Sequence, residues 1–126
     1  LDLGVNNRMS EIGALLCYSV LTETQSIIDN KYLIAQKYID ACNKYGWEFI
    51  DPQKNNQQSN LYKFTLLSRS DDPHKEFAQI KTRTSPVYDY ALGNDSAEVH
   101  KRHICLPIWY KFDDEEVKKV LLELRK

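Results

Sequence analysis

The chain has 126 residues, of which 42% are hydrophobic and 28% are charged, and its formal net charge is −1. These values are typical of one globular domain and not of a disordered chain. The near-neutral balance gives no general electrostatic reason to bind nucleic acid or an anionic membrane surface. No apolar run approaches the roughly 20 residues that cross a bilayer, and no leader predicts export, so we expect a cytoplasmic protein. Because the first residue is Leu1, we expect a fragment of a longer protein.

The cysteines and histidines do not form a metal-binding or disulfide pattern. Cys17, Cys42 and Cys105 are an odd and widely spaced set, which favours reduced core thiols in a cytosol. His100 and His103 lie three residues apart and just before Cys105, a spacing that can imitate a metal pair. However, the sequence offers no second ligand pair, and the two basic residues between the histidines would repel a cation. We therefore expect no structural zinc.

Residues 10–45 are predicted to form the dominant helical element. Ser10 is a favoured N-cap, and Gly46 fits a helix stop. Residues 22–26 are poor in strong helix formers, so we expect a kink or a join there unless tertiary context carries the helix through. Apolar residues at helical spacing form two stripes: Ile12, Leu15, Leu16 and Val20, and then Ile27, Ile34, Tyr38 and Cys42.

The middle of the chain reads as strands and short helices. Strands are expected over residues 47–50, 61–67 and 104–108, with an extended segment over 84–90. Residues 54–60 are polar and are predicted to be a loop. A short helix is expected from Asp72-Pro73 through Ile80, because an acidic cap followed by proline is a typical helix start. Asp95 with Glu98 indicates a second, brief helix that carries His100.

The last helix has the clearest signals. Asp113 with Glu116 forms a capping box, and Phe112 can pack on Val117 as a hydrophobic staple. Its apolar stripe, which must pack on the sheet, is Val117, Val120, Leu121 and Leu124. The predicted fold class is therefore α+β, with a long N-terminal helix and shorter helices packed on a small, mostly antiparallel sheet.

A polar stretch precedes the first helix. Asn6 can donate a neutral amide, and Arg8 offers a planar charged fork, immediately ahead of a helix N-terminus that carries partial positive charge. This grouping is typical of a site for a phosphate or a carboxylate. The alternative is a surface ion pair between Arg8 and Glu11, with Asn6 in a turn.

The pattern in and after this stretch is formed by Gly4, Asn6, Arg8, Met9, Ser10, Glu11, Ile12 and Ala14. It resembles the start of the C-terminal small domain of DegT/StrS-type sugar aminotransferases, which depend on pyridoxal phosphate. Residues 105–108 followed by 113–117 are similar to the closing strand and last helix of that family. The flanking residues Val5 and Asn7 depart from the aromatic residues that the family prefers.

The resemblance implies that residues 1–126 are one domain, the small domain of a fold-type I enzyme whose large domain is absent. It also implies that Asn6 reaches the cofactor phosphate of the other subunit in a homodimer, and that Arg8 orients groups near the active site. The Schiff-base lysine and the cofactor-binding acid lie upstream in the family. We therefore assign no catalytic residue to this chain and expect it to be inactive alone.

Four further residues are candidates for contact with a nucleotide-sugar substrate. Lys81, Arg83, Tyr88 and Tyr90 lie where many relatives carry a substrate loop, and such residues can grip a diphosphate and stack on a base or sugar. The alternative, slightly favoured, is an extended edge segment whose exposed cations prevent strand aggregation.

The family suggests an enzyme that transfers an amino group, with glutamate as donor, to a nucleotide-linked keto-sugar. Some relatives perform a sugar dehydration instead. A different class of protein also fits the residues, namely a non-catalytic α+β interaction module or a divergent relative that has lost its cofactor.

Overall fold

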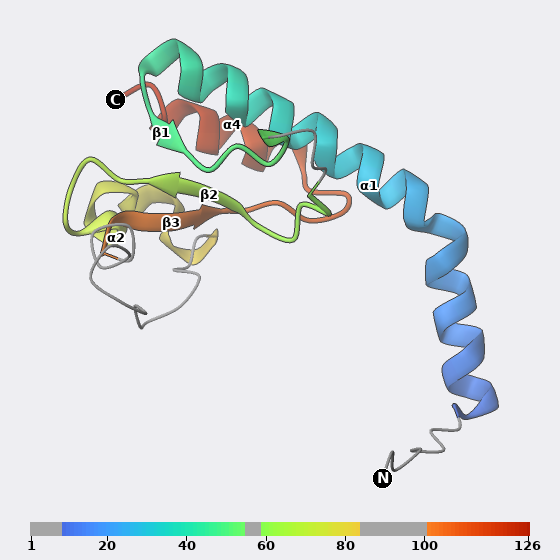
Figure 1. Cartoon of the computed structure of the whole chain (residues 1–126). Helices are drawn as coiled ribbons and strands as arrows, with labels where there is room; N and C mark the ends of the chain where they lie inside the picture. The colour runs from blue at the N-terminus through green and yellow to red at the C-terminus, as the bar shows by residue number, and fades with distance from the viewer. Residues whose placement is uncertain (1–8, 55–58, 84–100) are drawn as a thin grey trace, which may run out of the picture.

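The computed structural model describes residues 9–54, 59–83 and 101–126 (Figure 1). The elements, in chain order, are α1 (Glu11–Tyr45), β1 (Glu48–Phe49), β2 (Phe64–Leu67), α2 (Pro73–Glu76), the 3-10 segment η2 (Ala78–Arg83), β3 (His103–Leu106) and α4 (Asp114–Glu123). The predicted α+β class is confirmed. The extended segment predicted over 84–90 and the helix predicted to start at Asp95 lie outside the described residues.

The three described strands form an antiparallel sheet in the order β1-β2-β3. In the register of β2 with β3, Phe64 lies opposite Leu106 and Leu66 lies opposite Ile104. Alternate residues of a strand point to opposite faces, so these four side chains line one face, and all four are buried. This face holds the core of the molecule.

The strands are shorter than the sequence predicts. The strand expected over 61–67 begins only at Phe64. Leu61 is fully buried, but its φ of 51° is a left-handed conformation that interrupts extended backbone. The apolar pattern therefore identified the buried residues correctly, but it could not show that the backbone turns before the sheet.

Two helices cover the core face of the sheet. Figure 1 shows the C-terminal part of α1 and all of α4 side by side above the strands, and the two helices are in contact. The Tyr38 hydroxyl on α1 donates to the Pro107 carbonyl at 2.8 Å, and the Tyr38 ring meets the Phe64 ring edge-on at 5.4 Å. The Trp47 indole N–H donates to the Leu124 carbonyl at 2.8 Å. These contacts join both helices to the sheet.

Helix α1 begins and ends as its sequence predicts. The Ser10 Oγ accepts a hydrogen bond from the Gly13 N–H at 3.1 Å, which caps the start. At the end, Gly46 has a φ of 69°, and its N–H donates to the Cys42 carbonyl. Such a left-handed position carries little strain only in glycine.

The kink or join expected at residues 22–26 appears as a bend in one continuous helix of 35 residues (Figure 1). The hydroxyls of Ser19, Thr22, Thr24 and Ser26 each donate to a backbone carbonyl three or four residues earlier, at 2.8–3.1 Å. Such back-bonding competes with the helical ladder and often bends a helix.

The two apolar stripes of α1 have different environments. In the second stripe Ile34, Tyr38 and Cys42 are buried, whereas every large apolar residue of the first stripe is exposed. We call residues 11–26 the arm, because no residue of this fully described segment is buried and it extends away from the sheet (Figure 1).

Helix α4 is capped by Asp113, whose carboxylate accepts from the Glu115 N–H at 2.9 Å. It packs against α1 and η2 and joins the sheet through the shared core. Phe112 and Val117 are both buried in that core, as the predicted staple requires, and Leu121 is only partly buried. The buried members of its stripe are Val117, Val120 and Leu124.

Candidate functional site

The predicted anion site lies at the start of α1. The structure describes this helix from its cap onward, and Asn6 and Arg8 lie outside the described residues. Ser10 has extended backbone, and its carbonyl accepts from the Ala14 N–H at 2.8 Å, so the first turn is well formed. Glu11 is the acid of that turn. This end of α1 therefore carries the partial positive charge of a helix N-terminus, and its cap, Ser10, follows Arg8 by two positions in the sequence.

The second predicted group is described only in part. The backbone of Lys81 and Arg83 belongs to η2, and their side chains, together with Tyr88 and Tyr90, lie outside what the structure describes. The start of α1 is at the far end of the arm from η2 (Figure 1). Within this one chain, the start of α1 and η2 therefore lie in different parts of the described structure.

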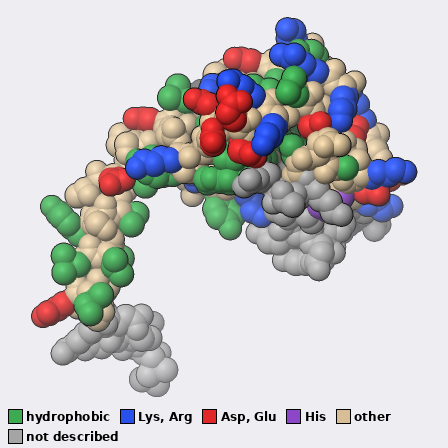
Figure 2. Space-filling view, turned by 180° about the vertical axis from the view of Figure 1, so that it is seen from behind, with side chains coloured by type: hydrophobic (Ala, Val, Ile, Leu, Met, Phe, Trp, Pro, Cys, Tyr) green, Lys and Arg blue, Asp and Glu red, His purple; other side chains and the backbone are tan. Residues whose placement is uncertain are grey.

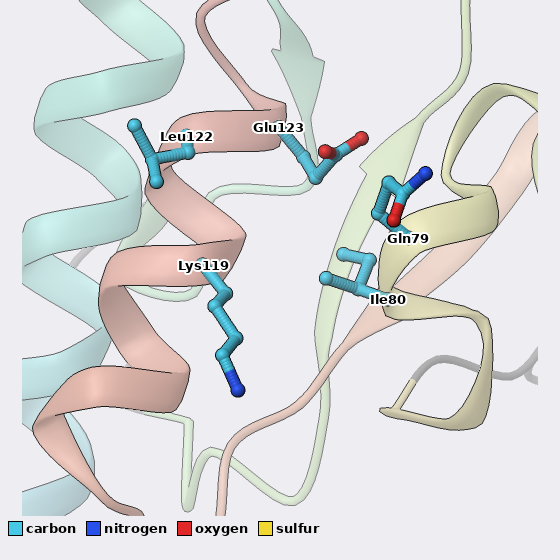
Figure 3. A pocket seen from close by; sticks show the side chains of 5 residues that line it. All are labelled: Gln79, Ile80, Lys119, Leu122 and Glu123. Carbon is cyan, nitrogen blue, oxygen red and sulfur yellow. The ribbon is translucent and has the colours of Figure 1, made fainter.

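A shallow cavity of about 320 Å³ lies between η2 and α4 (Figure 3). Its lining residues are Gln79, Ile80, Lys119, Leu122 and Glu123. Lys119 donates to Glu116 at 2.7 Å, and Glu123 accepts from Lys126 at 2.5 Å, so both charged side chains already have partners. The cavity lies at the contact between η2 and α4, and its lining residues include no group arranged for acid–base or nucleophilic chemistry.

A polar network at the end of β2 was not predicted from the sequence. Ser68 is fully buried; its hydroxyl contacts the Glu76 carboxylate and lies 2.8 Å from the Ser70 carbonyl. Arg102 donates to the Ser68 carbonyl at 2.7 Å and pairs with Glu48 at 3.3 Å. The network ties β2 to α2, β1 and the start of β3. Arg102 lies 34 and 54 positions from its partners Ser68 and Glu48, so no local pattern could have revealed those contacts.

Arg69 makes a second unpredicted connection, between the sheet and α1. Its guanidinium lies 3.8 Å from the centre of the Trp47 ring and donates to the Tyr45 carbonyl at 2.5 Å. A cation on the last carbonyls of a helix complements the negative end of its dipole. Both this contact and the Ser68 network join elements of the fold, and none of their residues lines the cavity between η2 and α4.

The cysteines are free thiols with different environments. Cys17 is exposed on the arm, whereas burial raises the pKa of Cys42 to about 12 and also raises the pKa of Cys105. Neither buried thiol is suited to act as a nucleophile at neutral pH. His103 lies in β3 and is buried, and His100 is not described. Among the residues that the structure describes, no group of three or more His, Cys, Asp or Glu could hold a metal.

A bent helix that lies with a second helix over a small antiparallel sheet forms an α+β domain. The model of the DegT/DnrJ/EryC1/StrS aminotransferase family matches residues 1–125. The chain belongs to this family, whose enzymes depend on pyridoxal phosphate and are generally dimeric.

The fold is similar to that of a crystal structure described as an aminotransferase, TlmJ from Streptoalloteichus hindustanus. The TM-score is 0.77 at 16% sequence identity, and the match covers 97% of this chain but only 37% of that chain. The chain thus spans little more than a third of the length of this structural relative. No curated protein matches the sequence. Within the described ranges, no helix is long and apolar enough to cross a membrane.

Proposed function

We propose that residues 1–126 are the C-terminal small domain of a pyridoxal phosphate-dependent aminotransferase. The observation that carries this proposal is the family match along almost the whole chain, together with the shared fold. The enzyme would transfer an amino group from glutamate to a nucleotide-linked keto-sugar. The large domain would supply the Schiff-base lysine and the acid that pairs with the pyridine nitrogen, which is why we assign no catalytic residue to this chain.

The chemistry of the residues ahead of α1 fits the cofactor phosphate. Asn6 would donate its amide to a phosphate oxygen in the other subunit of a homodimer, and Arg8 would add a charged, planar donor beside it. The capped first turn of α1 supports this assignment, because the positive end of a long helix dipole favours an anion nearby. When bound, the cofactor supplies the electron sink for amino transfer.

The substrate would be held by a second group of residues. We assign Lys81 and Arg83 to the diphosphate, and Tyr88 and Tyr90 to the base or sugar. Because η2 and the start of α1 are far apart within one chain, one site could hold both groups only with contributions from two subunits. This separation supports a homodimer. We place the enzyme in the cytoplasm, where its three free thiols would stay reduced.

Asn6→Ala in the full-length polypeptide tests the cofactor assignment. One charge-assisted hydrogen bond contributes about 1.5–3 kcal/mol, so the dissociation constant for pyridoxal phosphate should rise by roughly tenfold or more. Spectral titration with the cofactor gives the measurement. Asn7→Ala is the matched control, since it removes the same amide one residue away and should leave the affinity unchanged. Equal affinities of all three proteins would remove Asn6 from the site.

A further inference from the structure

The polar network at the end of β2 joins two segments that are far apart in the sequence. The Ser68 hydroxyl contacts the carboxylate of Glu76, the last residue of α2. The Ser68 carbonyl accepts from the guanidinium of Arg102, the residue before β3, at 2.7 Å, and the Ser68 N–H donates to the Arg102 carbonyl at 2.7 Å. We call Ser68, Glu76 and Arg102 the clamp. It connects the two positions between which residues 77–101 run.

The clamp is centred on a fully buried residue, and its polar groups have partners. Ser68 is fully buried, and 27% of the Arg102 side chain is exposed. The Glu76 carboxylate also accepts from the Arg69 N–H at 3.1 Å, and the Ser68 Oγ accepts from the Ser70 N–H at 3.0 Å. A satisfied polar network of this kind often adds no more to stability than apolar packing would, but it specifies one arrangement of the backbone.

The clamp holds the chain at the point where it enters η2. Glu76 is followed by Phe77 and Ile80, which are both buried in the core. Lys81 and Arg83, which we assign to the substrate diphosphate, lie in the second half of η2. Their backbone therefore follows directly from a stretch that the clamp and the core hold in place.

The same contacts hold the other end of the segment. Figure 1 shows α2 beside the start of β3, and the two elements are in contact. Bringing two such distant positions of a chain together costs conformational entropy, and polar contacts between them offset part of that cost. The four residues that we assign to the substrate all lie between the two ends of the clamp: Lys81, Arg83, Tyr88 and Tyr90.

The charge of the surface makes the placement of individual donors important. On the face shown in Figure 2, acidic and basic side chains are interspersed, and the net charge of the chain is −1. A mixed surface on a near-neutral chain gives little long-range attraction for a diphosphate. Its affinity would then depend on a few donors held in the right geometry.

We propose that Ser68 and Arg102 are positioning residues for the substrate. Through Glu76 they hold η2 against the start of β3, so that the donors of η2 face the diphosphate in one fixed arrangement. The clamp acts through η2, and we assign its residues no contact with the substrate or the cofactor. This inference rests on the proposed function, which supplies the substrate.

Trypsin cleavage after Lys81 and Arg83, followed by mass spectrometry, tests the clamp without cofactor or substrate. The 126-residue chain is suitable because its own helices and sheet form its core. Arg102→Gln removes the charged donor to the Ser68 carbonyl, so opening at η2 and cleavage there should be roughly tenfold faster. Ser68→Ala removes the hydroxyl contact with Glu76 and should act in the same direction. Rates equal to that of the unchanged chain would overturn the proposal.

Tyr38→Phe is the matched control, since it removes a buried hydrogen bond at another point of the core. It should leave cleavage in η2 unchanged. The same acceleration in this control as in Arg102→Gln would indicate a general loss of stability and contradict the proposal.

Steady-state kinetics of the full-length polypeptide tests the effect on the substrate. An aminotransferase handles its two substrates in separate half-reactions, so kcat/KM can be measured for each. Arg102→Gln should lower kcat/KM for the nucleotide-linked keto-sugar by about threefold or more, because the competent arrangement of η2 is less populated. The value for glutamate should stay unchanged, and Tyr38→Phe should change neither. A fall of both values by the same factor, or of neither, would contradict the proposal.

The two measurements separate this inference from the proposed function. A full-length polypeptide that neither binds pyridoxal phosphate nor transfers amino groups would disprove the proposed function, whatever the cleavage rates are. An active enzyme in which Arg102→Gln speeds cleavage but leaves kcat/KM for the sugar unchanged would disprove this inference alone.

Discussion

At the scale of single residues, Tyr38 joins α1 to β2 and to the segment that follows β3. It is fully buried, its ring packs on Phe64, and its hydroxyl donates to the Pro107 carbonyl. Burial also raises the pKa of its phenol, so the hydroxyl remains a donor even in alkaline solution. The sequence placed this residue correctly on a buried stripe, but its polar partner lies 69 positions away and could not be predicted.

Tyr38→Phe should lower the free energy of unfolding by about 1–3 kcal/mol, because it leaves the Pro107 carbonyl buried without its donor. Tyr18→Phe is the control, since Tyr18 is 67% exposed on the arm and its hydroxyl should contribute little. Denaturant unfolding of the 126-residue chain measures both. Equal effects of the two substitutions would mean that the hydrogen bond to Pro107 does not contribute to stability.

The buried thiol of Cys42 makes stability depend on pH. Burial raises its pKa from 9.0 to about 12, so the unfolded chain loses this proton before the folded chain does. The free energy of unfolding should therefore be unaffected by this group below about pH 9. Between about pH 9 and 12 it should fall by about 1.4 kcal/mol per pH unit for one group.

Denaturant unfolding at a series of pH values measures this slope. Cys42→Ala should reduce it above about pH 9, whereas Cys17→Ala should not, because Cys17 is exposed. Other groups, including Tyr38, add to the alkaline loss, so the difference between the two variants is the informative quantity. Identical slopes in both variants would show that the Cys42 thiol is not shielded from solvent.

At the scale of elements, α4 shows which part of a predicted apolar stripe is buried. The stripe predicted for this helix is buried at Val117, Val120 and Leu124, but Leu121 is only partly buried. The reason is that α4 packs between α1 and η2, so it presents a narrower face to the core than a helix lying flat on a sheet. A helical wheel gives the direction of the face but not its width.

Leu124→Ala should lower the free energy of unfolding by about 2–5 kcal/mol, the range for emptying a buried leucine site. Leu121→Ala should cost less, and Leu122→Ala, at a side chain that is 54% exposed, should change stability by no more than about 0.5 kcal/mol. Thermal and denaturant unfolding of the three variants measure the order of these stability losses. A larger effect at Leu122 than at Leu124 would mean that α4 is docked on a different face.

The helix ends were predictable because their signals are local. Ser10, Gly46, Asp72 and Asp113 each act on backbone within four residues, and the structure has them as caps. Strand limits were less predictable, since the left-handed backbone at Leu61 depends on contacts elsewhere in the fold. The bend of α1 lies near residues 22–26, the stretch from which a kink or join was predicted.

At the scale of the whole molecule, the sequence predicted the fold class and the family but not which apolar stripe would be buried. The first stripe of α1 is as hydrophobic as the second, yet it lies outside the core. An apolar pattern indicates that a helix face favours burial, but it does not show which part of a protein covers that face. For the candidate site, Asn6 and Arg8 remain predictions that rest on the motif and on the capped helix that follows them.

Amino transfer by the full-length polypeptide tests the proposed function. With glutamate and a nucleotide-linked keto-sugar, formation of 2-oxoglutarate should require added pyridoxal phosphate, and the 126-residue chain alone should form none. A full-length protein that neither binds the cofactor nor consumes glutamate with any nucleotide-linked keto-sugar offered would contradict the proposed function.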